Sequence, residues 1–342
     1  MINGVPQNDM ENGWVYWSNW DGVGDATHSI QMQRGLSAVN LATPSIGGTM
    51  NIITDPAAMS KGGSFKQEAG AGSFLKSSIN YNTGLIADKF AFSSTIVRKT
   101  GKGIIDKNWT DAWAYYFGSS LQLNDANRFE LYAIGAPQRH GQNLYKQNAS
   151  AYSQEFAKDE LGYSQEALDA FPESTHGEGG RFYSENWNSV SESYTGKQYW
   201  YMYGDREVER HDKGFLNERE NFFHKPLVNL NHYLTLNDKM NVSSILYWSG
   251  GSGGGSGTYD NDAATYDSTT MAWTKNTGSG GFMWDYSGPS RVADWDANIA
   301  MNQGTEDRKG GVKEAGESLA ILRNSINRQN TIGVISKLNY DL

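Results

Sequence analysis

The stretch that decides the fold is IQMQRGLSAVNLATPSIGGTMNIITD, residues 30–55. It holds an Arg34-Gly35 pair, then a Gly47-Gly48 pair, and then a compact run of β-forming residues at 49–54. Glycines at such places indicate turns that need a positive φ or a close approach of two backbone segments. The run after them predicts a short buried strand. We therefore expect Gly47 and Gly48 to serve folding, with a backbone geometry that a Cβ would disturb.

This stretch resembles the end of the plug domain of TonB-dependent outer-membrane receptors, where an Arg-Gly pair precedes a Gly-Gly pair and an Asn-Ile-Ile-Thr run. Near the start of the chain, residues 2–6 (INGVP) resemble a turn of the same plug. The resemblance implies that residues 1–58 are the C-terminal part of a plug domain and that residues 59–342 are the N-terminal part of a β-barrel. It also implies a piece of a longer protein, because the family's coupling box, the first half of the plug and the remaining strands are not in this sequence.

The composition excludes several classes of protein. The 342 residues include no Cys, which excludes disulfide scaffolds, thiolate metal sites and Cys nucleophiles. No run approaches the roughly 18 apolar residues of a transmembrane helix. The mean hydropathy of −0.62 is low, but the strands of a membrane β-barrel alternate in polarity and give only a weak signal. The aromatic content of 13% suits interfacial girdles, and it equally suits a carbohydrate-binding β-protein.

Segments of about ten residues alternate between apolar and polar side chains, which is a strand signal. They are 74–83, 111–123, 227–236, 240–249 and 331–340. Their polar faces are rich in Asn, Ser and Gln, which would pack poorly in a sandwich core but suit a water-filled or plugged lumen. We therefore expect a mostly β fold, namely a partial transmembrane antiparallel β-barrel of about eight strands with the C-terminal part of a plug domain.

The connections alternate in length, as they do in an outer-membrane barrel. Short connections that are rich in Asn and Asp lie near 84–88, 124–127 and 237–239. The long ones, at about 139–225 and 250–326, are expected to be extracellular loops, and Gly250–Gly257 is interpreted as a flexible part of the second. These two loops carry net charges of −5 and −4, which together equal the net charge of the chain, −9. They are either simply solvated or form an acidic vestibule that favours cationic or neutral solutes.

No constellation of residues indicates catalysis. The six His are scattered without ligand spacing such as HExxH, and no Ser-His-Asp order stands out. We expect no enzyme activity, no metal site, no cofactor and no nucleic-acid partner.

Clustered aromatic residues are the candidates for ligand contact, because exposed rings can stack on a planar or sugar-like solute. The candidates are Trp14, Tyr16, Trp17, Trp20, Trp187, Tyr199, Trp200 and Tyr201. Mutual packing within a core or within the long loops would use the same residue types, so both interpretations stay open.

The resemblance implies a function at the outer membrane of a Gram-negative bacterium. Such a receptor binds a scarce small solute at its extracellular loops and plug, lies in the lipid bilayer, and imports the solute with energy from a TonB-type energy-transducing protein. The alternative is a soluble, secreted, β-rich carbohydrate-binding protein. That alternative accounts for the Tyr and Trp content, but not for the plug motif or for long loops on one side only.

Two further expectations concern packing. The resemblance implies that Arg34 lies buried between plug and barrel wall, paired with an inward-facing carboxylate, because a lone buried guanidinium would be costly. The partner is expected to be Glu68 or Glu130, or a carboxylate of the strands that are not in this sequence. We also expect the chain not to form a closed barrel, since an eight-stranded lumen has room only for its own side chains. The strand near 329–340 would then have an unpaired edge.

Overall fold

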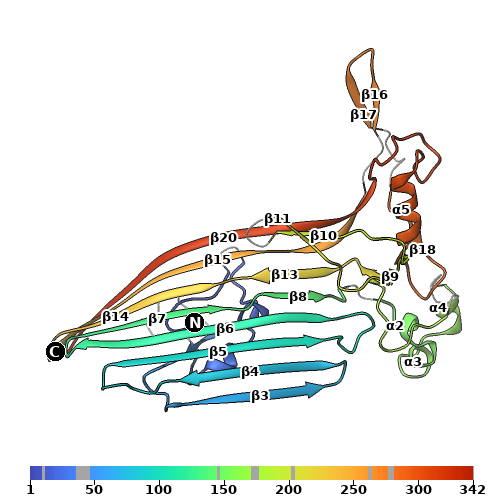
Figure 1. The fold of residues 1–342 in the computed structure, drawn as a ribbon. Helices are drawn as coiled ribbons and strands as arrows, with labels where there is room; N and C mark the ends of the chain where they lie inside the picture. Colours follow the sequence, from blue (N-terminus) through green and yellow to red (C-terminus); the bar gives the residue numbers. More distant parts are fainter. Residues whose placement is uncertain are drawn as a thin grey trace.

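The computed structural model describes residues 1–9, 12–35, 47–144, 147–170, 177–201, 205–260, 264–275 and 281–341. Its main feature is a large, curved antiparallel sheet, which runs from β3 at one edge to β20 at the other (Figure 1). Its strands are β3 (Gly62–Gly70), β4 (Phe74–Asn82), β5 (Phe90–Gly101), β6 (Thr110–Asn124), β7 (Asn127–Gly135), β8 (Gln138–Gly141), β13 (Glu220–His224), β14 (Leu227–Asn237), β15 (Met240–Asp260) and β20 (Ala320–Tyr340).

The remaining elements lie before the sheet and in its two long connections. The N-terminal segment holds η1 (Trp17–Trp20), α1 (Val23–Ala26), β1 (Ser29–Arg34) and β2 (Gly48–Ile53). The first long connection holds α2 (Ala149–Tyr152), α3 (Gln154–Asp159), α4 (Gln165–Asp169), β9 (Trp187–Ser189), β10 (Gln198–Tyr201), β11 (Asp205–Val208) and β12 (Phe215–Asn217). The second holds β16 (Ala264–Asp267), β17 (Ala272–Lys275), β18 (Trp284–Asp285), β19 (Val292–Ala293) and α5 (Trp295–Gln303). No helix in the described part of the chain is long and apolar enough to cross a membrane.

The ten strands of the sheet occupy eight positions across it, because two pairs of strands are collinear. β6 pairs with β7 along one half of its length and with β8 along the other half. β15 pairs in the same way with β14 and β13. Pro137 and Pro226 stand at the two breaks, where a proline cannot donate a ladder hydrogen bond. The expected fold class, mostly β with about eight antiparallel strands, is confirmed.

The sheet is open. Within the described residues, β3 pairs with β4 alone, and β20 pairs with β15 alone. The expectation that the chain does not form a closed barrel is therefore confirmed, and one free edge runs along β20 as expected.

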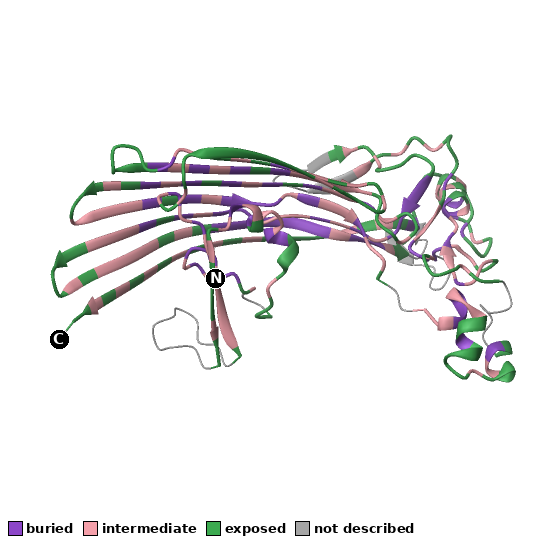
Figure 2. Cartoon of the chain, turned by 90° about the horizontal axis from the view of Figure 1, so that it is seen from below, coloured by how far each residue is buried: buried purple, intermediate pink, exposed green. Residues whose placement is uncertain are grey.

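The two faces of the sheet have opposite polarity, as the alternating segments predicted. On the outer face, a row of directly opposed residues crosses four strands, namely Leu131, Leu230, Leu246 and Val334. These side chains are 49%, 39%, 50% and 69% exposed. Their neighbours Asn229 and Asn231 point to the inner face and are buried. Figure 2 shows this alternation along the strands and the N-terminus on the inner side of the sheet.

The N-terminal segment covers the inner face and shares a hydrophobic core with it. Residues from the segment and from strands β6, β7 and β14 form one cluster: Ile2, Val5, Trp20, Val23, Ala26, Ile52, Tyr116, Tyr132, Ile134 and Leu227. Each is at most 8% exposed. The polar inner face is therefore buried by the segment and not by a second sheet.

The run Gly250–Gly257 is a strand and not a flexible loop, so that interpretation of the sequence is wrong. It lies within β15, which pairs with β20 along all 21 residues and with β13 on its other side. The ladders satisfy the glycine backbone groups, and the missing side chains let neighbours approach. A Cβ at Gly254 would collide with the backbone oxygen of Ser325, whereas a Cβ at Gly255 would meet Asn221 Nδ2 at 3.6 Å.

The long connections are correspondingly shorter than the sequence suggested. β8 and β13 belong to the sheet, so the first connection leaves the sheet after Gly141 and returns at Glu220. The second leaves after Asp260 and returns at Ala320. Both contain helices and small hairpins, because long connections of this size need their own packed elements to be stable.

We expect Gly254→Ala to lower the free energy of unfolding by about 1–3 kcal/mol, because the added Cβ forces β15 away from β20. Gly255→Ala is the matched control and should change it by no more than about 0.5 kcal/mol. Unfolding of detergent-solubilised protein, followed by circular dichroism of the β signal, measures both. Equal effects of the two substitutions would contradict the strand assignment.

Candidate functional site

The two sequence motifs of the N-terminal segment meet in the structure. Asn3 and Gly4 form a tight turn with φ angles of 48° and 83°, a conformation that favours Asn and Gly. The side chain of Asn3 donates from Nδ2 to Thr54 Oγ1 at 2.8 Å, and Asn3 Oδ1 accepts from the backbone N–H of Thr54 at 2.9 Å. Asn3 and Thr54 are buried, so these hydrogen bonds replace water and fix the turn against the end of β2.

The glycines of residues 30–55 differ in whether their backbone geometry requires a glycine. Gly35 has a φ of 78° and Gly48 a φ of 126°, and a Cβ at Gly48 would collide with the carbonyl oxygen of Gln33. The expected backbone requirement is thus confirmed for Gly48. For Gly47 it is wrong, because its φ is not in the positive region and nothing lies within 4 Å of an added Cβ.

The expected burial of Arg34 is also wrong. Arg34 is exposed and lies opposite Gly48, at the end of the β1–β2 hairpin that is farther from the buried residue Ile52. The two proposed partners pair elsewhere. Glu68 binds Lys66 at 3.0 Å and Lys76 at 3.4 Å, while Glu130 accepts from Tyr132 Oη at 3.0 Å. An exposed guanidinium avoids the desolvation cost that made a buried partner necessary.

Ion pairs that the sequence did not reveal hold the N-terminal segment to the wall. Asp25 of α1 binds Lys76 of β4 at 2.7 Å, and Asp21 binds Lys99 of β5. The alternation of segment 74–83 places Lys76 on the same face as the buried residue Ser78, but the sequence does not identify its partner, because about 50 residues separate the two. These half-buried ion pairs fix the position of the N-terminal segment on β4 and β5. Hydrophobic contact alone is non-directional and would let the segment shift along the wall.

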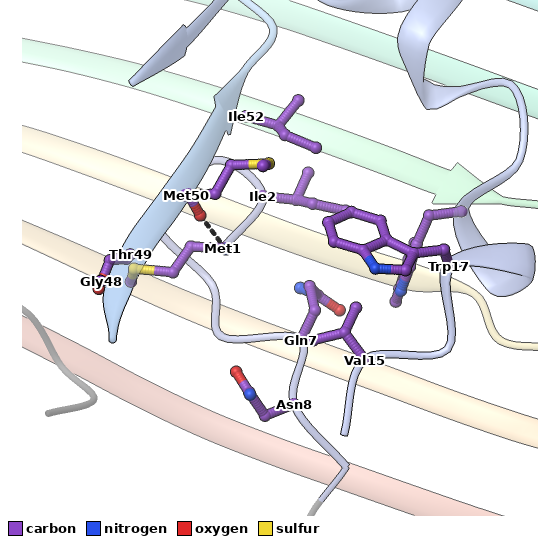
Figure 3. Close-up of a pocket in the computed structure, with 11 residues that line it drawn as sticks. Met1, Ile2, Gln7, Asn8, Val15, Trp17, Gly48, Thr49, Met50 and Ile52 are labelled. Atoms are coloured by element: carbon purple, nitrogen blue, oxygen red, sulfur yellow. Dashed lines mark hydrogen bonds between the residues drawn. The ribbon is translucent and has the colours of Figure 1, made fainter. Parts of the chain in front are cut away.

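A first cavity, of about 240 Å³, lies within the N-terminal segment (Figure 3). Ile2, Met50 and Ile52 lie opposite Val15 and Trp17 in this view. The cavity is bordered by apolar and amide side chains and holds no charged side chain among its lining residues. The amino group of Met1 donates to the carbonyl oxygen of Met50 at 2.6 Å beside it. We call it the N-terminal cavity.

A second, larger cavity of about 560 Å³ separates the N-terminal segment from the inner wall of the sheet. We call it the wall cavity. Its segment side is polar and consists of Asp9, Asn12, Tyr16, Ser18 and Asn19. Its wall side comes from β13, β15, β20 and the residues next to them: Gln142, Leu144, Arg219, Asn221, Phe223, Lys225, Gly254, Gly255, Ser256, Gly257, Arg323, Ser325, Asn327, Arg328 and Gln329. It is open to solvent and adjoins both long connections.

The aromatic candidates separate into several environments. Tyr16 lines the wall cavity, and Trp17 and Trp20 line the N-terminal cavity. Trp14 and Tyr16 are exposed, and Trp17 is 59% exposed, whereas Trp20 is 5% exposed and belongs to the shared core. The side chains of Tyr199, Trp200 and Tyr201 lie outside the described residues, although the backbone of β10 is described.

Trp187 lies apart from both cavities, in an aromatic cluster near the long connections. Its ring meets Phe215 edge-on at 6.1 Å, and Lys107 Nζ lies 5.2 Å from its ring centroid. In the same cluster, His211 stacks on Trp109 at 3.9 Å. Burial lowers the pKa of His211 and so favours the neutral imidazole. This arrangement is mutual packing of a loop against the sheet.

The wall side of the larger cavity was missed by sequence reasoning. Because the composition of the glycine run predicts a loop, the sequence does not indicate that β13 and β20 lie on either side of it. A signal was present, because Gly occupies every second position from 251 to 257. Such a period of two places all four glycines on one face of a strand. Among the described residues, no three His, Asp or Glu side chains gather as a metal site.

Comparisons with known proteins give matches among solved structures only. No family model matches the chain, and no curated protein matches it. The chain is similar to the ferric-catecholate import receptor Fiu from E. coli K12 in its open form, with 11% identity and a TM-score of 0.47 over 93% of this chain and 58% of that one. It is similar to the siderophore receptor PiuA from Acinetobacter baumannii, with 12% identity and a TM-score of 0.41 over 92% and 45%.

A third match is the pyoverdine outer membrane receptor FpvA from Pseudomonas aeruginosa, with 11% identity and a TM-score of 0.44 over 78% of this chain and 33% of that one. The chain therefore spans between a third and three fifths of the length of these proteins. At such identities and TM-scores the likeness is one of general shape, and function has to be argued from the residues themselves.

We expect Trp20→Ala to lower the free energy of unfolding by about 3–5 kcal/mol, because it removes a large buried ring from the shared core. Trp17→Ala should change it by about 0.5 kcal/mol or less, since that ring is mostly exposed. Chemical unfolding in detergent measures both values. A similar loss for the two variants would show that Trp17 is also part of the core and is not free for ligand contact.

Proposed function

We propose that this chain is part of a TonB-dependent receptor of the Gram-negative outer membrane, which binds a scarce small solute and imports it. The observation that carries the proposal is the row Leu131, Leu230, Leu246 and Val334, whose side chains are exposed on one face across β7, β14, β15 and β20. Soluble monomers rarely expose apolar patches of more than a few hundred Å². A lipid-facing strand, in contrast, presents apolar residues outward and polar residues inward.

The N-terminal segment supports the same proposal. It carries the resemblance to a plug, and it fills the inner side of the curved sheet through the shared core and the ion pairs of Asp21 and Asp25. A lumen that is closed by a separate segment requires a signal to open it. We propose that a TonB-type energy-transducing protein supplies that signal through an N-terminal box, as the family resemblance implies.

The first proposed ligand contacts lie in the N-terminal segment. Trp14, Tyr16 and Trp17 are exposed, so stacking on a solute stays a proposal for these three rings. Trp20 would support them from the core without touching the solute. Tyr199, Trp200 and Tyr201 remain proposed contacts from the first long connection, and Trp187 is better explained by packing on Phe215.

The alternative, a soluble secreted carbohydrate-binding protein, has the aromatic residues in its favour. It leaves the exposed apolar row unexplained, and it also leaves the edges of β3 and β20 unprotected against aggregation. The two proposed functions predict different effects of a charged residue on the outer face, because only in a lipid-facing surface would a new charge prevent membrane insertion.

We expect Leu246→Arg to prevent stable membrane insertion, at a cost of about 2–4 kcal/mol, because Leu246 is at the middle of the apolar row. Leu161→Arg is the control, since Leu161 is equally exposed but lies between two loop helices. The measurement is outer-membrane fractionation of cells that express the protein with an export leader. If Leu246→Arg behaves like Leu161→Arg, or if the unmodified chain is a monodisperse, water-soluble monomer, the receptor proposal fails.

A further inference from the structure

The outer face of the sheet is covered at its loop end, although it is exposed along the apolar row. β13 continues the register of β14 against β15 without a shift. Phe222 of β13 lies eight residues from Leu230 of β14, so it points to the same outer face. Leu230 is 39% exposed, whereas Phe222 is completely buried. The neighbours of Phe222, Asn221 and Phe223, line the wall cavity on the inner side, as the alternation requires.

The first long connection provides this cover. Phe222 belongs to a cluster with Trp109 and Phe215, against which Val208 of β11 packs. His211 stacks on the Trp109 ring at 3.9 Å. β10 lies against β15 and is drawn across it in Figure 1. We call residues 197–201 and 205–209, which contain β10 and β11, the outer hairpin.

A buried guanidinium holds the outer hairpin in this place. Arg139 opposes Phe222 in the ladder, so it also points outward. It donates to Gln198 Oε1 at 2.9 Å and to the carbonyl oxygen of Glu209 at 3.3 Å, and it lies 3.6 Å from the carboxylate of Glu220. Hydrogen bonds from a charged donor are stronger than neutral ones. The hairpin is therefore bound to the outer wall and does not close over the lumen.

The cover begins close to where the apolar surface ends. On β6, the outward residues Phe117 and Trp113 are 39% and 51% exposed. The guanidinium of Arg98 lies 5.1 Å from the centroid of the Trp113 ring and pairs with Asp111 at 2.6 Å. An exposed aromatic ring beside charged groups, at the end of an apolar band, is typical of the membrane–water interface. Trp113 therefore marks the expected level of the lipid headgroups.

The height of the cover above this level follows from strand geometry. Trp109 precedes Trp113 by four residues, which span about 13 Å along a strand. A strand tilt of about 40° reduces this to about 10 Å along the membrane normal. The headgroup layer on each side of a bilayer is roughly 5–8 Å thick. With Trp113 inside that layer, the segment that covers Trp109 lies at its outer surface.

The side of the outer hairpin that points away from the wall carries charges of both signs. Gln198 and Val208 oppose each other in the hairpin, and both contact the wall. Lys197 and Glu207 are 45% and 47% exposed and form an ion pair at 2.8 Å, and Glu209 is 74% exposed. Such a surface would be costly in hydrocarbon. It suits a layer that itself contains phosphate and ammonium groups, because each sign finds a partner there.

We propose that the outer hairpin rests on the outer leaflet and that Lys197, Glu207 and Glu209 contact its lipid headgroups. The inference rests on the proposed receptor function and adds to it a membrane contact outside the lumen. Its basis is continuity, because the hairpin lies on the same face as the apolar row and just beyond the interfacial Trp113. It competes with the solute contacts proposed for residues 199–201, since a strand on the outer face does not line the lumen.

The test uses the chain in phosphatidylcholine vesicles, with and without a small fraction of a lipid whose headgroup chelates nickel. Single nitroxide labels are attached to the variants Glu209→Cys, Trp113→Cys and Leu161→Cys. Nickel at the headgroups speeds the relaxation of nearby nitroxides. We expect the labels at 209 and 113 to relax about twofold faster or more with the nickel lipid, because both lie at the headgroup layer. The label at 161 is the matched control, since Leu161 is exposed in the same connection but lies between two loop helices, and it should not change.

Unchanged relaxation at residue 209, together with faster relaxation at residue 113, would overturn the inference, because the hairpin would then stand away from the bilayer. An equal effect at residue 161 would overturn it too, since the contact would not be specific to the outer hairpin. If residue 113 does not respond, the outer face does not meet lipid, and the receptor function fails together with this inference. The two failures are thus distinguishable.

Discussion

The ladder between β15 and β20 imposes the constraint on which the rest of the structure depends. Over 21 paired residues, successive side chains point to opposite faces. The register therefore decides which residues lie on each face. Leu246 and Val334 are outward, while Tyr247 and Gly333 are inward. Once this register is set, the apolar row, the bare glycine face and the place of the N-terminal segment all follow.

The N-terminal segment provides hydrogen-bond partners for the polar inner face that this register creates. The inner face of the sheet is lined by Asn, Ser and Tyr, which would be costly to bury without partners. The segment supplies them: a carbonyl group from Asn3 accepts from Asn231 at 3.5 Å, and Asp25 accepts from Ser78 at 3.4 Å. The same segment brings apolar residues such as Trp20 and Val23 against Tyr116 and Tyr132. This interface therefore contains both polar and apolar contacts.

Much of the sheet could be predicted from sequence because a period of two is a local property. Leu75 and Ile79 are exposed and Ser78 is buried, in agreement with the alternation of segment 74–83. Non-local facts could not be predicted in this way. The glycine run has no side-chain pattern of its own, so its strand conformation depends on β13 and β20. Arg34 was placed by family resemblance, and its exposure follows from its position at the far end of a hairpin. Arg219 and Arg323 both line the wall cavity although more than 100 residues separate them in sequence, and such a pairing of distant segments leaves no local pattern.

The central claim is that the outer face of this sheet faces lipid. It is tested most directly by nitroxide labels placed one at a time at residues 241–248 of β15, in protein reconstituted into liposomes; the absence of native Cys makes each label unique. We expect labels at 242, 244, 246 and 248 to collide with oxygen and not with a water-soluble nickel complex. Labels at the odd positions should not show this preference for oxygen to the same degree. If the even positions collide with the nickel complex as freely as a label at exposed Trp14, the outer face lies in water and the account is contradicted.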